Sequence, residues 1–230
     1  MPAQVDAARP SRDHHAAYAW LANPELVVDD LDARLRIDVG PAGSPIHARE
    51  ARIEKDAEGR ERISDAGSEP VVVVPVGTTV ALNNVTGCVT IGDTDGPLTL
   101  RLCDGCEVHA GRVASADVRI DGNSRVTIAE VDGGRLDVDV TGRGRVDAGG
   151  EVGRFASTVH GAGDVQLRGC ADEAQLTVEG SGHICVTRVR RGLASICVGS
   201  GDIAVSFPPC PVSDRSAVIF DGLFASLAGR

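Results

Sequence analysis

Between Ala81 and Ser206, apolar residues occupy every second position in short stretches that recur at a nearly constant interval. Three phrases, GAGDV from Gly161, GSGHI from Gly180 and GSGDI from Gly199, start 19 residues apart. The β-branched residue that ends each phrase belongs to a longer series of anchors: Val89, Val108, Val126, Val146, Val165, Ile184 and Ile203. A fixed period near 20 residues is typical of a solenoid, because each unit is too small to bury its own apolar face and must stack on a neighbour.

The residues around each anchor alternate as in a strand with one buried face. Two residues after each anchor stands another apolar residue, and the residue between them is mostly polar. A second strand precedes the glycine phrase, with the inward pairs Leu100/Leu102, Val118/Ile120, Val138/Val140 and Leu176/Val178. The glycines fall where this strand must turn a corner, which requires a positive φ or a close backbone approach. The pattern predicts an all-β, single-stranded β-solenoid (β-helix) of about seven rungs of ~19 residues, with short helical or irregular N- and C-terminal segments.

The same pattern divides the chain into four regions. We expect an N-terminal arm with a short helix over residues 1–30, strands leading into the repeats and a charged hairpin or loop over 31–80, β-solenoid repeats over 81–206, and a C-terminal cap or docking tail over 207–230. The charged stretch has a turn signal at 56–59, and Val71–Gly77 is predicted as a buried strand.

Composition narrows the function classes. The net charge of −10 opposes binding to nucleic acid or to anionic membrane surfaces, because both reward Lys and Arg. No stretch approaches the ~18 apolar residues of a membrane span. No basic region followed by an apolar run is seen near Met1, so the seven cysteines favour reduced thiols and a cytoplasmic location.

Two motifs suggest chemistry, and each has a plainer interpretation. The sequence CDGCEVH, from Cys103 to His109, resembles half of a zinc site, but a structural zinc site needs four ligands, usually supplied by two such pairs. Gly-Ser-Gly at 180–182 and 199–201 lacks the Gly-x-Ser-x-Gly spacing of a nucleophile elbow and the third glycine of a dinucleotide fingerprint. We expect solenoid corners at both places.

Carboxylates on the repeat faces are a third candidate, since some parallel β-helices act on polysaccharides. Asp137, Asp139 and Asp147 are the residues that such a sugar-cleaving site would use. Mixed charges stacked on neighbouring rungs are more often a solvated ladder of ion pairs, each contributing about 0–1 kcal/mol. The sequence predicts no catalytic residue, no metal ligand and no cofactor.

A family resemblance accompanies these patterns. The block from Val159 to Pro208, with its Gly-x-Gly-Asp-Val corner, its Gly169-x-Ala171-Asp172 spacer and its Phe207-Pro208 exit, resembles the head domain of auto-transporter adhesins, also called the GIN domain. The sequence PVGTT from Pro75 and TGCVTI from Thr86 are similar to a group of adhesin-like β-strand repeat proteins. The resemblance covers roughly residues 71–208. It implies a β-solenoid fold, no catalytic residues and a cell-surface location as the alternative to the cytoplasm.

Together these observations predict a non-enzymatic structural or interaction protein: a rigid β-solenoid scaffold that presents terminal segments to protein partners or to copies of itself. The alternatives are a self-polymerising, bactofilin-like cytoskeletal rod and a polysaccharide-acting β-helix enzyme. Large apolar side chains concentrate beyond the repeats, where they either cap the rod or dock into another subunit. The predicted interaction residues are Tyr18, Trp20, Ile219, Phe220, Leu223, Phe224 and Leu227.

Overall fold

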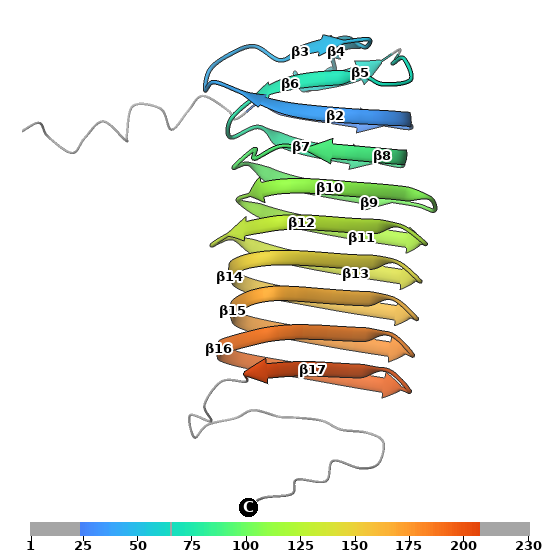
Figure 1. Cartoon of the computed structure of the whole chain (residues 1–230), viewed down its shortest axis with the longest axis vertical. Coiled ribbons are helices and arrows are strands. Elements are labelled where there is room, and N and C mark those ends of the chain that lie inside the picture. The colour runs from blue at the N-terminus through green and yellow to red at the C-terminus, as the bar shows by residue number, and fades with distance from the viewer. Residues whose placement is uncertain (1–23, 65, 208–230) are drawn as a thin grey trace, which may run out of the picture.

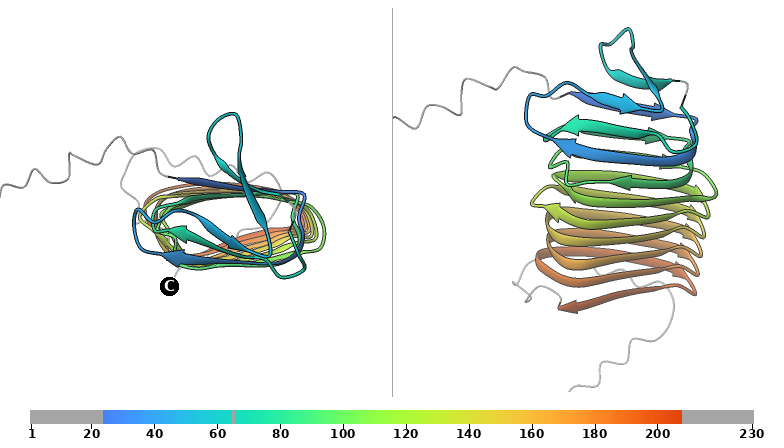
Figure 2. Two further views of the ribbon diagram at one scale, coloured as in Figure 1. Left: turned by 90° about the horizontal axis from the view of Figure 1, so that it is seen from above. Right: turned by 45° about the horizontal axis from the view of Figure 1, so that its top comes forward.

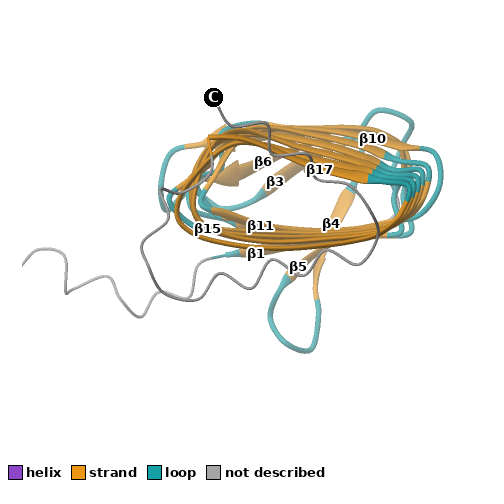
Figure 3. Cartoon of the chain, turned by 90° about the horizontal axis from the view of Figure 1, so that it is seen from below, coloured by secondary structure: helices purple, strands orange, loops and turns teal. Residues whose placement is uncertain are grey.

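The computed structural model describes residues 24–64 and 66–207, and these form a rod built from strands and turns (Figures 1 and 3). One sheet of seventeen strands winds through the described residues. The predicted β-solenoid is confirmed. In chain order the strands are β1 (Glu25–Asp29), β2 (Asp32–Gly40), β3 (His47–Arg49), β4 (Arg52–Lys55), β5 (Glu61–Ser64), β6 (Val71–Pro75), β7 (Thr79–Asn83), β8 (Thr86–Ile91), β9 (Pro97–Leu102), β10 (Cys106–Val113), β11 (Ser115–Gly122), β12 (Arg125–Asp132), β13 (Arg135–Gly142), β14 (Arg145–Gly161), β15 (Asp164–Gly180), β16 (His183–Gly199) and β17 (Asp202–Phe207).

The repeats stack as two broad parallel faces that enclose a flat interior (Figure 2). The first face contains β1, β7, β9, β11, β13 and the C-terminal halves of β14, β15 and β16. The second face contains β6, β2, β8, β10, β12, the N-terminal halves of β14–β16, and β17. The last three long strands run through one corner without a break, so each contributes to both faces.

The predicted anchor column is confirmed residue by residue. Each anchor pairs with the anchor of the next rung, from Val89 through to Ile203. All anchors above the last rung are buried, and so are the inward pairs of the second strand. Phe155, the one aromatic residue of the repeat region, is fully buried in the same interior. The alternation in the sequence therefore reports which side chains point inward.

The glycines at the C-terminal ends of β11 and β13–β16 stack into one continuous corner. Gly122, Gly142, Gly161, Gly180 and Gly199 pair in register, with φ between +107° and +127°. A side chain is strained at such φ values, and a Cβ on Gly180 would also lie 2.5 Å from the carbonyl oxygen of Gly161. Glycine is required here both by conformation and by the close approach of the rungs.

The N-terminal end departs from the expected boundaries. Residues 25–29, which fall in the expected arm, form strand β1, with Leu26 and Val28 fully buried. β1 pairs with β5 and β7, and β2 pairs with β6 and β8. β1 and β2 thus form one rung. The chain then runs to the N-terminal end of the rod, where it forms β3–β6. It returns to add β7 and β8 on the opposite side of the β1–β2 rung (Figure 1). The solenoid begins before residue 81 because the run Leu26–Val28 is apolar enough to be a core strand.

The charged stretch, for which the sequence left a hairpin or a loop open, is a hairpin. β4 and β5 pair antiparallel around the turn at 56–59, and Asp56 accepts backbone hydrogen bonds from Glu58 and Arg60. The hairpin also covers the core, since Ile63 is only 7% exposed and Ile53 packs against the buried cluster. β3 adds antiparallel to β6 at the same end. Short antiparallel elements therefore close the N-terminal end of the rod.

Candidate interaction surface

Charged side chains cover much of the two broad faces and pair between rungs. The Arg168 Nε donates a hydrogen bond to Asp147 Oδ1 at 2.7 Å, and Arg190 Nη2 lies 2.9 Å from Glu151 Oε1. Hydrogen bonding and charge from Glu151 raise the pKa of Arg190 above its ordinary value. These pairs are exposed, so each contributes little to stability.

The three carboxylates considered for sugar cleavage do not form one group. Asp137 and Asp139 lie on β13, in the first face, and Asp137 is paired with Arg135. Asp147 lies on β14, in the second face, where it pairs with Arg168. The interior of the rod separates the two faces, so Asp147 cannot act with the other two on one glycosidic bond.

The Cys103–His109 stretch is likewise divided. Cys103 is exposed and Cys106 is 3% exposed, whereas His109 points outward, 3.4 Å from Glu107. Burial, together with nearby Cys88, raises the pKa of the Cys106 thiol to about 11. In the part of the chain that the structure describes, no three His, Cys, Asp or Glu side chains are grouped to hold a metal ion.

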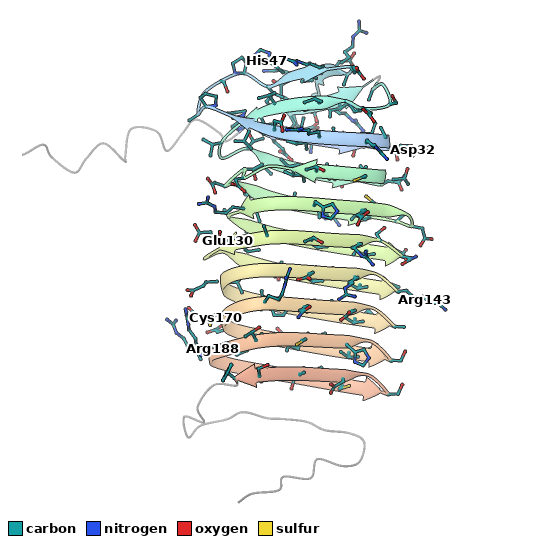
Figure 4. All side chains as sticks on the ribbon, in the orientation of Figure 1. Asp32, His47, Glu130, Arg143, Cys170 and Arg188 are labelled. Carbon is teal, nitrogen blue, oxygen red and sulfur yellow. The ribbon has the colours of Figure 1, made fainter. Side chains whose placement is uncertain are left out.

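A shallow groove of about 410 Å³ follows the glycine corner. Arg125, Arg143 and Arg145 line it, and Arg143 projects from this edge of the rod (Figure 4). Arg145 pairs with Asp164 at 3.6 Å, and Glu107 lies in the same lining. The groove is therefore lined by both positively and negatively charged side chains.

The outer surface of the rod changes character at its last rung. Along the first face, three outward columns can be followed from rung to rung in register. In the rungs of β13–β15 these columns carry mostly polar residues, whereas in the last rung all three are apolar. The columns read Asp137–Ala156–Gln175–Ala194, Asp139–Thr158–Thr177–Ile196 and Thr141–His160–Glu179–Val198. We call Ala194, Ile196 and Val198 the outer stripe; Ile196 is 47% exposed and Val198 is 52% exposed.

The interior is also open at this end. Leu193, Cys197, Ile203 and Val205 face the core but are only partly buried. Within the described residues, β17 pairs with β16 alone, so its other edge carries unpaired backbone groups. Phe207 is 55% exposed, and its ring packs against the Arg188 guanidinium at 5.1 Å from the ring centroid. Arg188 lies at the corner of the rod opposite Arg143 (Figure 4).

The interaction residues predicted from the sequence all lie outside the described residues: Tyr18, Trp20, Ile219, Phe220, Leu223, Phe224 and Leu227. They remain predictions. Sequence reasoning did not single out the outer stripe, because Ile and Val are ordinary strand residues. Comparing the same column across rungs would have found it, since Thr158 and Thr177 are followed by Ile196.

Comparisons with known proteins agree with this architecture. Residues 96–209 match the family model described as "Putative auto-transporter adhesin, head GIN domain", which confirms the resemblance seen in the sequence. A putative adhesin from Parabacteroides distasonis is 11% identical, covers 80% of this chain and 93% of its own, and superposes with a TM-score of 0.50. A putative adhesin from Parabacteroides merdae is 12% identical, with 80% and 91% covered and a TM-score of 0.46.

No curated protein matches the sequence. At 11% identity, the Parabacteroides distasonis structure shows a shared fold and nothing finer. In residues 24–64 and 66–207 there is no helix that is long and apolar enough to span a membrane.

Proposed function

We propose that this chain, whose residues 96–209 match the GIN head-domain model, is a rigid β-solenoid scaffold that presents its terminal segments to partner subunits at the cell surface. The adhesin-like β-solenoid fold supports the general part of this proposal, a non-enzymatic interaction protein. The family's adhesin description supports the surface location, and the comparisons give no support to the cytoplasmic location expected from the sequence. They favour neither a filament-forming rod nor a polysaccharide-acting enzyme.

One observation carries the proposal: the two ends of the rod are built differently. The N-terminal end is closed by β3 and by the β4–β5 hairpin, whereas the last rung leaves Ile196, Val198 and Phe207 exposed. Exposed aliphatic and aromatic side chains grouped at one place are typical of interaction sites. The stack between the ends is held by parallel pairing in every rung, so it can keep a terminal segment in a fixed orientation.

Affinity purification from the native cell tests the proposal, with the full chain as bait. In the polar-tail variant, Ile219, Phe220, Leu223, Phe224 and Leu227 are all changed to Ser. A second variant carries Tyr18→Ser with Trp20→Ser, and the matched control carries Thr158→Ser with Thr177→Ser on an outer face. We expect the control to recover the same partner as the parent and at least one terminal variant to lose it.

Recovery of the same partner by both terminal variants would overturn the proposal. If only the Thr158→Ser, Thr177→Ser control loses the partner, the binding site lies on a broad face of the rod instead. Release of sugars from a panel of polysaccharides by the purified chain would favour the enzymatic alternative.

A further inference from the structure

The outer stripe is the least expected feature of the rod's surface. An outward strand face that contacts water is normally polar and alternates with the apolar inward face. Here the last rung does the opposite: Ile196 and Val198 stand where Thr177 and Glu179 stand one rung earlier. An outward strand face that is apolar resembles that of a strand covered on both sides.

The chain itself delivers a segment to this place. β17 ends at Phe207, which packs against Arg188, just before the corner that leads into Leu193 and the outer stripe. Twenty-three residues follow Phe207. The next of them contain Pro208, Pro209 and Pro211, which donate no hydrogen bonds to a sheet, so a further regular rung is disfavoured.

The reach and the pattern of this segment both fit the stripe. Residues 208–212, if extended as proline-rich chain, span about 15 Å, which exceeds the spacing of about 10 Å between two stacked sheet faces. Beyond them, the spacing of the five large apolar residues from Ile219 to Leu227 would place them on one side of a helix if this stretch were helical. An amphipathic helix on an apolar groove is a common way to cover such a surface.

We infer that residues 213–230 pack their apolar side against the outer stripe and the open rim of their own rod, and so form the C-terminal cap. A tethered segment has an effective concentration in the millimolar range for a short linker, which favours it over a second copy at ordinary protein concentration. The inference rests on the proposed function, in which the rod presents its terminal segments. It adds that the C-terminal segment is held in a fixed position on the rod.

Thermal melting of full-length variants tests the contact. Ile196→Lys places a charge in the stripe, and its matched control, Thr177→Lys, places the same charge one rung higher in the same column. Each substitution is measured in the parent and in the polar-tail variant. The inference expects Ile196→Lys to lower the melting temperature by several degrees in the parent and by much less in the polar-tail variant. Thr177→Lys should have the same small effect in both.

Each other outcome overturns the inference. Equal effects of Ile196→Lys in the parent and in the polar-tail variant would mean that the segment does not cover the stripe. The effect of Ile196→Lys could instead differ between the parent and the polar-tail variant only at high protein concentration, with a dimer seen in light scattering. That result would identify a second copy of the chain as the occupant of the stripe. These melting measurements use the isolated protein, so they test the contact within the chain separately from partner binding. The contact can be absent while partner recovery still depends on the terminal segments, and the contact can be present while partner recovery does not.

Discussion

The two ends of the rod solve the same physical problem in different ways. Each end of a solenoid exposes an unpaired strand edge and the interior of its last rung. At the N-terminal end, antiparallel β3 pairs with β6, and Ile53 and Ile63 of the hairpin cover the core. At the C-terminal end, Ile203 and Val205 are only partly buried, and Phe207 is exposed.

The difference follows the chain's own construction. The N-terminal cap is an insertion of short, charged strands whose large apolar residues, Ile53 and Ile63, pack against the core, which suits an end that faces water. The last rung instead carries apolar residues, Ala194, Ile196 and Val198, on the outer side of the first face, where the neighbouring rungs carry mostly polar ones. Such an end needs a covering segment, so the comparison contrasts closure by paired strands at the N-terminal end with the proposed closure by residues 213–230 at the C-terminal end.

The largest effect is expected in the middle of the stack, where neither end matters. Val165→Asp puts a carboxylate between Val146 and Ile184 in the interior, at a cost of several kcal/mol against a typical total of about 5–15 kcal/mol. Unfolding in urea, followed by circular dichroism, should show a lost or badly weakened fold. Ile203→Asp, in the same column at the open rim, should cost less. A Val165→Asp protein that melts within a few degrees of the parent would contradict the inward anchor column.

The N-terminal cap should contribute strongly through one side chain. Ile63→Ala removes a buried side chain from the hairpin and should destabilise the protein by about 2–5 kcal/mol. Arg62→Ala on the same strand breaks an ion pair with Asp29 in which the Arg62 side chain is half exposed, and should cost about 1 kcal/mol. Equal small losses in equilibrium unfolding would show that the hairpin does not close the core.

The glycine corner should tolerate substitution only where the rungs leave space. Gly180→Ala forces a side chain into φ +127° against the neighbouring rung and should cost about 1–3 kcal/mol. Gly192→Ala, at the opposite corner, meets only the flexible side chain of Glu173 and should stay within about 0.5 kcal/mol. Similar melting temperatures for the two variants would argue against a tightly stacked corner.

Thiol labelling gives the smallest and most local contrast between interior and rim. Cys106 is buried and its pKa is raised to about 11, so at pH 8 it should label far more slowly than exposed Cys103. Because the folded-state pKa lies above the ordinary value of 9.0, its stabilising effect is present below pH 9 and is lost as pH rises towards 11. Cys197, at the open rim, should label faster in the polar-tail variant than in the parent. Unchanged Cys197 labelling would argue that nothing covers the rim.

Much of the stack could be predicted from the sequence, because the rungs repeat. Val108, Val126 and Val146 stand in equivalent places, and parallel in-register pairing converts that equivalence directly into contact. The glycine corner could be predicted for the same reason, since each glycine stacks on another.

The ends could not be predicted in the same way, because periodicity is lost there. The rung formed by β1 and β2 pairs with β7 and β8 at an offset of 54 residues, after the cap is inserted between them. No repeat links Leu26 to Val80 in the sequence. The outer stripe was missed because alternation identifies inward residues, while Ile196 and Val198 depart from the pattern on the outward side.

Hydrogen exchange of the full chain tests the central claim most directly, by comparing both ends in one measurement. Peptides covering β6, at the N-terminal end, and those covering Gly192–Gly199 and β17, at the C-terminal end, are compared between the parent and the polar-tail variant. The account predicts that the variant loses protection at the C-terminal peptides alone, while β6 exchanges at the parent's rate. Unchanged protection at Gly192–Gly199, or an equal loss at both ends, would contradict it.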